Sequence, residues 1–140
     1  MSSIASVYVA KQADLPEIAA AGLEHLHELA REVEDAYDWS GRVLYFLIES
    51  LEEQGIQLSS AEFGDVEEAL EAFVIGPDRK VLLPQLDPEA NDPDEVRAWL
   101  ADWDMDFEEA GEAGIDALTM LHEQISALPD DSVLIVHIAS

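Results

Sequence analysis

Alternating carboxylates are the first pattern in this chain that could do chemistry, because such spacing opens calcium-binding loops. Asp102, Asp104 and Asp106 are spaced in this way. A loop of this type also requires glycine at its sixth position and a bidentate glutamate at its twelfth, and these positions hold Phe107 and Ala113. We therefore keep the three aspartates as candidate metal ligands and interpret them first as charges that favour a helix N-terminus.

Histidines are the other side chains that could bind a metal or transfer a proton. His25 and His27 lie two residues apart on an expected helix, so they point about 200° away from each other and cannot share a metal as an i, i+4 pair would. His122 and His137 lie on the expected last helix and last strand, and the fold could bring them together; a core or hydrogen-bonded role is their ordinary interpretation. In so acidic a chain, nearby negative charge favours raised histidine pKa values.

Motifs for the common catalytic and nucleotide-binding sites are absent from the sequence. There is no GxSxG, no GxxxxGK[ST] or GxGxxG, no HExxH and no cysteine. Paired carboxylates carry no signal either, because 32 acidic residues produce pairs by chance. The sequence therefore assigns no catalytic residue and no cofactor and favours a protein that is not an enzyme. A hydrolase or metal-dependent enzyme with a carboxylate and histidine site stays as an alternative.

Large aromatic side chains are candidates for binding rather than for catalysis. Trp99 and Trp103 are four residues apart and share one face of an expected helix, whereas Trp39 precedes another. Core packing is the ordinary role of such residues. Because tryptophan and tyrosine are enriched among the residues that dominate interfaces, we take the three tryptophans and Tyr45 as candidate interaction residues.

Apolar strands at both ends of the chain must position these side chains. Residues 4–9 and 132–138 are β-branched runs that predict strands. Residues 133–136 are all apolar, so the second strand is expected at the centre of a sheet covered on both sides, paired with the first. A shorter apolar run at residues 81–83 predicts an edge strand.

Periodic apolar positions and capping residues predict helices over most of the remaining chain. Ser40 caps one helix that Gly55 ends, and Asp92 followed by Pro93 starts another. The predicted helical segments are 14–22, 23–33, 40–55, 59–73, 92–103 and 106–128. Together these patterns predict an α+β fold and a single domain over residues 1–140. Its small mixed sheet includes both terminal strands and is covered by five or six helices.

The charge of the chain is strongly one-sided, with 32 Asp and Glu against 6 Lys and Arg and a net charge of −26. Because 49% of the residues are hydrophobic, this charge is interpreted as the surface of a folded domain rather than as a disordered acidic tail. Binding to nucleic acid or to an anionic membrane is disfavoured, because both depend on Lys and Arg. Basic proteins and cations are the partners that remain.

The order of the segments also carries a family resemblance. The chain opens with Met1-Ser-Ser-Ile-Ala-Ser-Val-Tyr8 and a helix start at residues 14–17, has Asp38-Trp39 ahead of Leu44-Tyr-Phe-Leu-Ile48, and closes with a helix and a strand over residues 107–138. In this order it resembles the YfbM-like family of small bacterial proteins, which have an aspartate and a tryptophan before a His-Phe-Leu-Leu-like helix core.

Two positions depart from that family pattern. Gly41 stands where the family usually has tryptophan, so Trp39 is expected to fill that role from a shifted position. Tyr45 stands where the family has histidine, so any function of that histidine is lost here. The resemblance implies an α+β domain with a small sheet covered by helices, and it implies no particular activity.

Charge and composition together favour a non-enzymatic interaction domain that binds a basic protein, as immunity proteins bind their toxins, because negative surface charge speeds the encounter. The alternative is a nucleic-acid mimic that occupies a DNA-binding protein, which needs carboxylates in two rows at phosphate spacing. The N-terminus lacks a basic leader, and no apolar run reaches the ~20 residues of a membrane span. A soluble cytoplasmic protein, monomeric or weakly dimeric, is therefore expected.

The net charge also predicts how stability responds to salt. An acidic surface of this kind repels itself at low ionic strength, and added salt screens the repulsion. We expect the melting temperature, measured by circular dichroism, to rise with sodium chloride concentration. A melting temperature that stays flat or falls as salt is added would contradict this interpretation of the charge.

Overall fold

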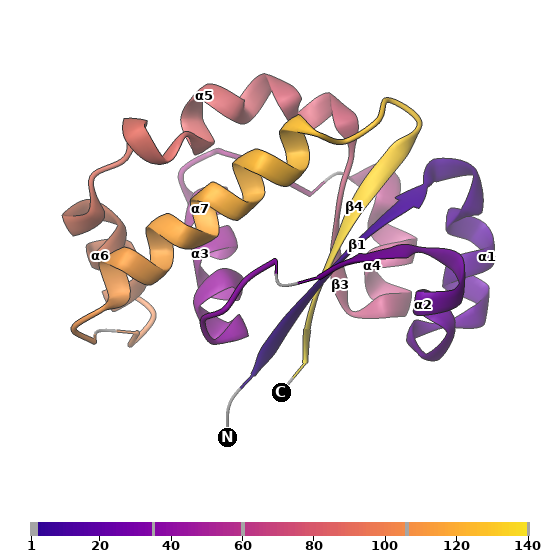
Figure 1. Ribbon diagram of the computed structural model, residues 1–140, viewed down its shortest axis with the longest axis horizontal. Helices are drawn as coiled ribbons and strands as arrows, with labels where there is room; N and C mark the ends of the chain where they lie inside the picture. Colours follow the sequence, from indigo (N-terminus) through magenta and orange to yellow (C-terminus); the bar gives the residue numbers. More distant parts are fainter. Residues whose placement is uncertain (1–2, 35, 60, 106, 140) are drawn as a thin grey trace.

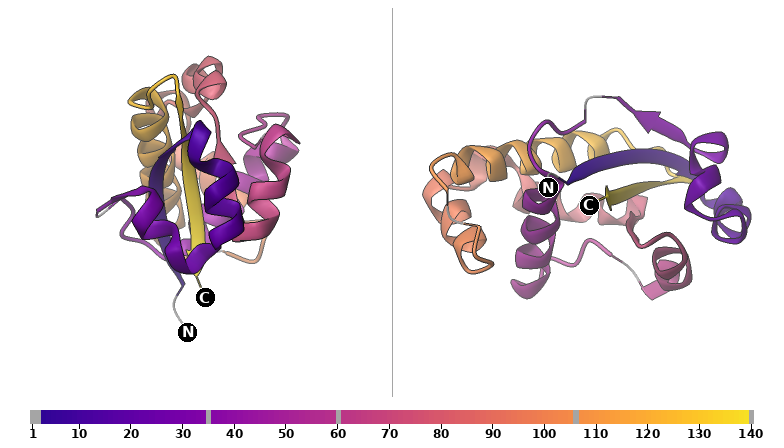
Figure 2. Two further views of the ribbon diagram at one scale, coloured as in Figure 1. Left: turned by 90° about the vertical axis from the view of Figure 1, so that its right-hand side faces the viewer. Right: turned by 90° about the horizontal axis from the view of Figure 1, so that it is seen from below.

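The protein is built around a four-stranded sheet whose faces are both covered by helices (Figures 1 and 2). The computed structural model describes the chain except residues 1–2, 35, 60, 106 and 140. In the described part the strand order is β2-β1-β4-β3, and every pairing is antiparallel. The strands are β1 (Ile4–Lys11), β2 (Arg31–Val33), β3 (Ala72–Ile75) and β4 (Ser132–Ala139).

Two helical layers enclose this sheet. The helices are α1 (Leu15–Ala21), α2 (Leu26–Leu29), α3 (Gly41–Glu53), α4 (Gly64–Leu70), α5 (Leu83–Leu86), α6 (Pro93–Ala101) and α7 (Ala110–Ser126). Buried residues of α3, α5, α6 and α7 form one apolar cluster on one face of the sheet, and those of α1, α2 and α4 form a second cluster on the other. The expected α+β class is confirmed, and the expected mixed sheet is corrected to an antiparallel one.

Strand β4 is central, as its apolar sequence predicts. It pairs with β1 over eight residues, from Ile4 opposite Ala139 to Lys11 opposite Ser132. Side chains alternate between the two faces of a strand, so Leu134 and Val136 enter one cluster while Val133 and Ile135 enter the other. Each fully buried aliphatic side chain of this kind stabilises the fold by roughly 1.5–3 kcal/mol. The two ends of the chain therefore form the centre of the core.

The start, the end and the buried face of helix α3 are all explained by its sequence. Ser40 is its N-cap, and the Ser40 Oγ accepts a hydrogen bond from the Arg42 N–H at 3.3 Å. Gly55, at a φ of 87°, follows the helix where a left-handed residue is needed. At its start the helix touches β1, since a Cβ on Gly41 would lie 2.9 Å from the Ile4 carbonyl carbon. Its buried stripe is Val43, Leu44, Leu47, Ile48 and Leu51.

The expected helix over residues 23–33 is wrong in its second half. Helix α2 ends at Leu29, Ala30 is extended at a φ of −135°, and the next three residues form β2. Val33 lies opposite Val7 of β1 and packs against the larger apolar cluster. Pairing with β1 satisfies backbone groups that the edge of β1 would otherwise leave open, and this overrides the local helical pattern.

The expected helix over residues 59–73 is also too long. It begins after Phe63 and stops at Leu70, and Glu71 is left-handed with a φ of 52°. The chain then enters β3, in which Phe73 faces the larger cluster and Val74 the smaller one. An aromatic residue followed by two β-branched residues suits a strand, and β4 supplies the partner for it.

Three smaller expectations can be compared with the structure. Residues 81–83 were expected as an edge strand and are helical instead, since they end the turn Pro77–Leu82 and start α5. The start of α6 is confirmed, with the Asp92 Oδ1 accepting from the Asp94 N–H at 2.8 Å. The last helix begins at Ala110, later than expected, and the expected start at Asp106 lies outside the described residues.

Close packing of α7 on α6 generates a stability prediction. A Cβ on Gly111 would lie 2.8 Å from the carbonyl oxygen of Pro93, so Gly111→Ala should lower the free energy of unfolding by about 1–3 kcal/mol. Gly64→Ala in α4 is the matched control, because a Cβ there meets nothing within 4 Å, and its effect should stay within about 1 kcal/mol. Urea denaturation measures both; equal losses would contradict this account of the helix pair.

Candidate functional site

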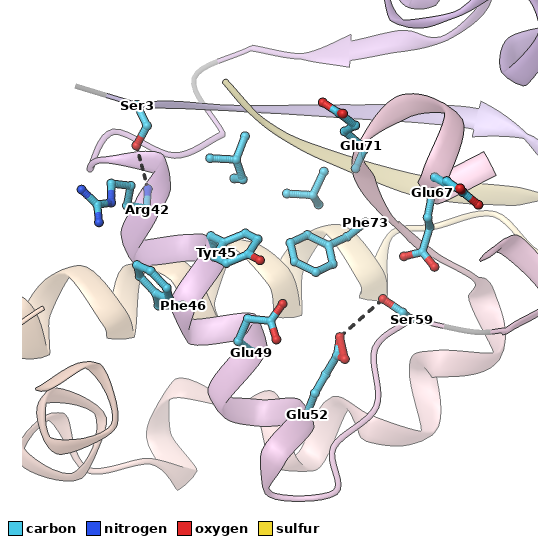
Figure 3. Close-up of a pocket in the computed structure, with 14 residues that line it drawn as sticks. Ser3, Arg42, Tyr45, Phe46, Glu49, Glu52, Ser59, Glu67, Glu71 and Phe73 are labelled. Carbon is cyan, nitrogen blue, oxygen red and sulfur yellow. Dashed lines mark hydrogen bonds between the residues drawn. The ribbon is translucent and has the colours of Figure 1, made fainter. Parts of the chain in front are cut away.

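A cleft of about 1010 Å³ opens at the β3 edge of the sheet, between α3 and α4 (Figure 3). Its walls come from segments that are far apart in the sequence, because α3 and α4 cover opposite faces of the sheet. The lining residues are Ser3, Arg42, Tyr45, Phe46, Glu49, Glu52, Ser59, Glu67, Glu68, Glu71, Ala72, Phe73, Val136 and Ile138. The volume is at the upper end of the range found for ligand pockets.

The floor of the cleft is aromatic and aliphatic. The ring centroids of Tyr45 and Phe73 are 5.7 Å apart, and those of Tyr45 and Phe46 are 5.3 Å apart in an edge-to-face arrangement. Val136 and Ile138 of β4 complete the floor. Tyr45 is 40% exposed, so apolar surface that the fold leaves uncovered is available to a ligand.

Helical spacing explains why α3 presents this surface. Arg42, Tyr45, Glu49 and Glu52 recur at intervals of three and four residues, so they lie along one stripe beside the buried one. The Arg42 guanidinium lies 5.8 Å from the centroid of the Phe46 ring, at one end of the cleft. The stripe therefore runs from one cation to two carboxylates.

Five glutamates line the cleft against a single arginine. The carboxylates of Glu49, Glu52 and Glu67 lie around the Phe73 ring (Figure 3). Ser59 Oγ donates a hydrogen bond to Glu52 at 3.4 Å, and the Val74 N–H donates one to Glu67 at 3.1 Å. Among the described residues, no Lys, Arg or His forms an ion pair with these three carboxylates. Within the described part of the chain, their negative charge is therefore not neutralised by an ion pair.

Burial and neighbouring carboxylates change the acidity of Glu52 and Tyr45 in the cleft. Burial raises the pKa of Glu52, and the nearby Glu49 and Glu67 carboxylates raise it further, against the opposing effect of the Ser59 hydrogen bond. Burial also raises the pKa of Tyr45, again helped by Glu49 and Glu52. In both cases burial is the main cause, and the neighbouring carboxylates add to it.

The structure places the four candidate interaction residues in different surroundings. Tyr45 lines the cleft, whereas the three tryptophans are half-buried outside it. The Trp103 Nε1 donates a hydrogen bond to the Ser50 Oγ at 2.9 Å. The Trp103 ring stacks on the ring of Phe46, which lines the cleft. The Trp39 Nε1 donates to the Asp116 Oδ2 at 2.7 Å and ties the segment before α3 to α7. Trp99 packs against the larger apolar cluster.

The candidate metal ligands and the histidines do not converge on this cleft. Asp102 and Asp104 are exposed, and Asp106 lies outside the described residues. In the part of the chain that the structure describes, no three His, Asp or Glu side chains are grouped so that they could hold a metal ion. Burial lowers the pKa of His137, so the raised value expected from the acidic composition is wrong for this residue, although Glu71 opposes the shift. His122 is not among the lining residues.

Sequence reasoning did not single out Glu49, Glu52 or Glu67. These three are indistinguishable from the other acidic residues by type, and they come together only because α3 and α4 reach the β3 edge from opposite faces of the sheet. A signal for Glu49 and Glu52 is present in the sequence, because both share one stripe of α3 with Arg42 and Tyr45. A stripe that contains a cation and an aromatic residue differs from a uniformly acidic, solvated helix face.

Comparison with known proteins found no match to this chain among protein-family models, curated proteins or solved structures. The resemblance to the YfbM-like family therefore stays a prediction. In the described part of the chain, the helices are too short or too polar to cross a bilayer.

The raised pKa of Glu52 predicts how stability depends on pH. The folded state holds this proton more tightly than the unfolded chain, so stability falls as pH rises from the ordinary glutamate pKa of 4.5 through the raised value. Glu52→Gln should therefore stabilise the protein at neutral pH and bring no gain below pH ~4, where the carboxyl is protonated in both states.

Glu53→Gln is the matched control for this prediction. Glu53 is exposed on the same helix, and its substitution makes the same change in net charge. Chemical denaturation at a series of pH values measures both variants. An equal gain for the two variants at neutral pH, or a gain for Glu52→Gln that persists at acid pH, would contradict the raised pKa of Glu52.

Proposed function

We propose that this protein binds a basic protein partner and that the cleft between α3 and α4 is its binding surface. The observation that supports this most directly is the set of three carboxylates, Glu49, Glu52 and Glu67, which lie beside an aromatic floor with the exposed Tyr45 ring and form no ion pair with a cation among the described residues. A ligand that brings positive charge together with apolar groups satisfies both parts of the cleft.

The shape of the site favours a segment of a protein over a simple metal ion. The glutamates are spread over two helices and the turn before β3, and the described residues hold no compact ligand group for a metal. Lysine and arginine side chains combine a charged end with an aliphatic stem, so one such residue can contact both a carboxylate and the aromatic floor. Aromatic residues beside bound cations add a favourable interaction with the ring face.

The biological role that we propose for this binding is immunity-like, with a basic toxin as the partner. The strong negative charge of the whole chain would speed association, and the cleft would supply the specific contacts. A basic protein encoded beside this chain is the first partner to test. It should co-elute with this protein in size-exclusion chromatography at low salt and separate when salt is raised, because exposed charge pairs are screened.

The binding surface can be tested with a defined probe, a short fluorescent peptide of alternating lysine and valine. The triple variant Glu49→Gln, Glu52→Gln, Glu67→Gln should bind this peptide about tenfold or more weakly than the wild type in fluorescence anisotropy at low salt. Three charge pairs worth up to about 1 kcal/mol each are lost in it. Glutamine preserves the size of each side chain and its ability to accept a hydrogen bond.

A second triple variant, Glu24→Gln, Glu53→Gln, Glu108→Gln, is the control. It makes the same change in net charge at exposed positions outside the cleft, and its affinity should stay within about threefold of the wild type. An equal loss of affinity in the two triple variants would mean that the peptide senses only the total charge. No loss in the cleft variant would contradict the proposed site.

A further inference from the structure

Arg42 is a cation in a cleft whose other charged residues are all acidic. Lys11, Arg79 and Lys80 lie 3.0, 3.9 and 3.9 Å from an aspartate carboxylate. In the described part of the chain Arg42 forms no such pair, although it is exposed and the chain has 32 acidic residues. Its guanidinium lies over the Phe46 ring, 5.8 Å from the ring centroid. Arg42 is therefore available to an anionic group of a ligand.

The place of Arg42 in α3 also favours an anion. It is the second residue of the helix, where the positive end of the helix dipole disfavours a cation. The Gly41 N–H donates to the Ser3 carbonyl at 3.0 Å, and the Arg42 N–H donates to the Ser3 Oγ at 2.9 Å. Because these two N–H groups are satisfied within the protein, an anion at this end is bound by the Arg42 side chain, and the helix dipole adds to the attraction.

The two ends of the cleft therefore differ in charge (Figure 3). Arg42 and Ser3 lie at one end and Glu52 at the other, with the Tyr45 and Phe73 rings between them. A ligand that carried only positive charge would be repelled at the Arg42 end. A ligand with a carboxylate at one end, apolar groups in the middle and a cation at the other end complements the whole length of the cleft.

We propose that the occupant of the cleft is the C-terminal segment of the basic partner, with its terminal carboxylate on Arg42. This inference rests on the proposed function and specifies which part of the partner binds and in which direction. Arginine holds a carboxylate through two parallel hydrogen bonds. Acidic side chains are scarce in a basic partner, whereas every chain ends in one carboxylate. Chain termini usually lie at the surface of a domain, so a terminal segment can enter a cleft without rearrangement of the rest of the partner.

The spacing of charges along α3 determines where this segment carries its own cation. Arg42 precedes Glu49 and Glu52 by seven and ten residues, which is about 10–15 Å at a helical rise of roughly 1.5 Å per residue. An extended segment advances about 3.3 Å per residue. We therefore expect a lysine or arginine three to five residues before the last residue of the partner. Apolar side chains between the two charges contact the Tyr45 and Phe73 rings.

The experiment uses a pentapeptide, Lys-Val-Ser-Thr-Val, with a neutral fluorescent label on its N-terminus and either a free C-terminal carboxylate or a C-terminal amide. The wild-type protein should bind the free acid at least about fivefold more tightly than the amide in fluorescence anisotropy at low salt. The net charge of −26 by itself attracts the amide more strongly, because the amide lacks the negative charge of the acid. A preference for the acid therefore reports a specific contact with the carboxylate.

Two variants and a second peptide locate this contact. Arg42→Gln should bind the acid no more tightly than the amide. Arg31→Gln makes the same change in net charge at an exposed position of β2 outside the cleft, and it should keep the preference of the wild type. The free acid Val-Ser-Thr-Lys-Val has its lysine beside the last residue, too near to reach Glu49 or Glu52. It should bind the wild type at least about threefold more weakly than the first peptide.

Four outcomes would overturn this inference. They are equal binding of the acid and the amide to the wild type, a preference for the acid that survives in Arg42→Gln, and equal binding of the two free acids. The fourth is an amidated peptide, Lys-Val-Ser-Thr-Glu, that binds as tightly as the first free acid, which would assign an acidic side chain in place of the chain end. If the inference fails while the cleft triple variant still weakens binding of the lysine–valine peptide and its control does not, the proposed function stands; if the cleft triple variant binds that peptide normally, both fail.

Discussion

Strand β4 has no face that can be left in water, because Val133, Leu134, Ile135 and Val136 are all buried. The chain therefore has to cover both sides of the sheet, and it does so with a layer of α3, α5, α6 and α7 on one side and of α1, α2 and α4 on the other. Where α3 and α4 approach the short strand β3 from opposite sides, the covering is incomplete (Figure 3). The cleft is thus a consequence of how the central strand is buried.

Charge acts on this framework in two ways. Over the whole chain the excess of 32 acids over 6 bases is distributed on exposed positions and at helix starts such as Asp92 and Asp94, where it favours solubility and helix capping. In the cleft, by contrast, burial raises the pKa of Glu52, and the nearby Glu49 and Glu67 carboxylates raise it further. Hydration and helix capping account for the first group, but they do not account for carboxylates grouped beside the exposed Tyr45 ring. The second group supports binding of a basic partner.

The sequence predicts well those features that depend on near neighbours along the chain. The Ser40 cap, the apolar stripe of α3 and the continuous apolar run of β4 are local signals, and all three are confirmed. Strands β2 and β3 were missed because a three- or four-residue strand depends on its partner, and β1 and β4 are distant in the sequence. The cleft was missed for the same reason, although Tyr45 was among the candidates. Its glutamates become distinctive only when α3 and α4 reach the edge of β3 from opposite faces of the sheet.

The most direct measurement of the central claim is a map of amide chemical-shift changes in the ¹⁵N-labelled protein as the lysine–valine peptide is added. The account predicts that the large changes are confined to α3 from Tyr45 to Glu52, to Glu67 and Glu68, and to the start of β3. Small changes spread over exposed acidic residues on all helices, with none at Phe73, would contradict it. That result would reduce the negative charge to a general property of the surface.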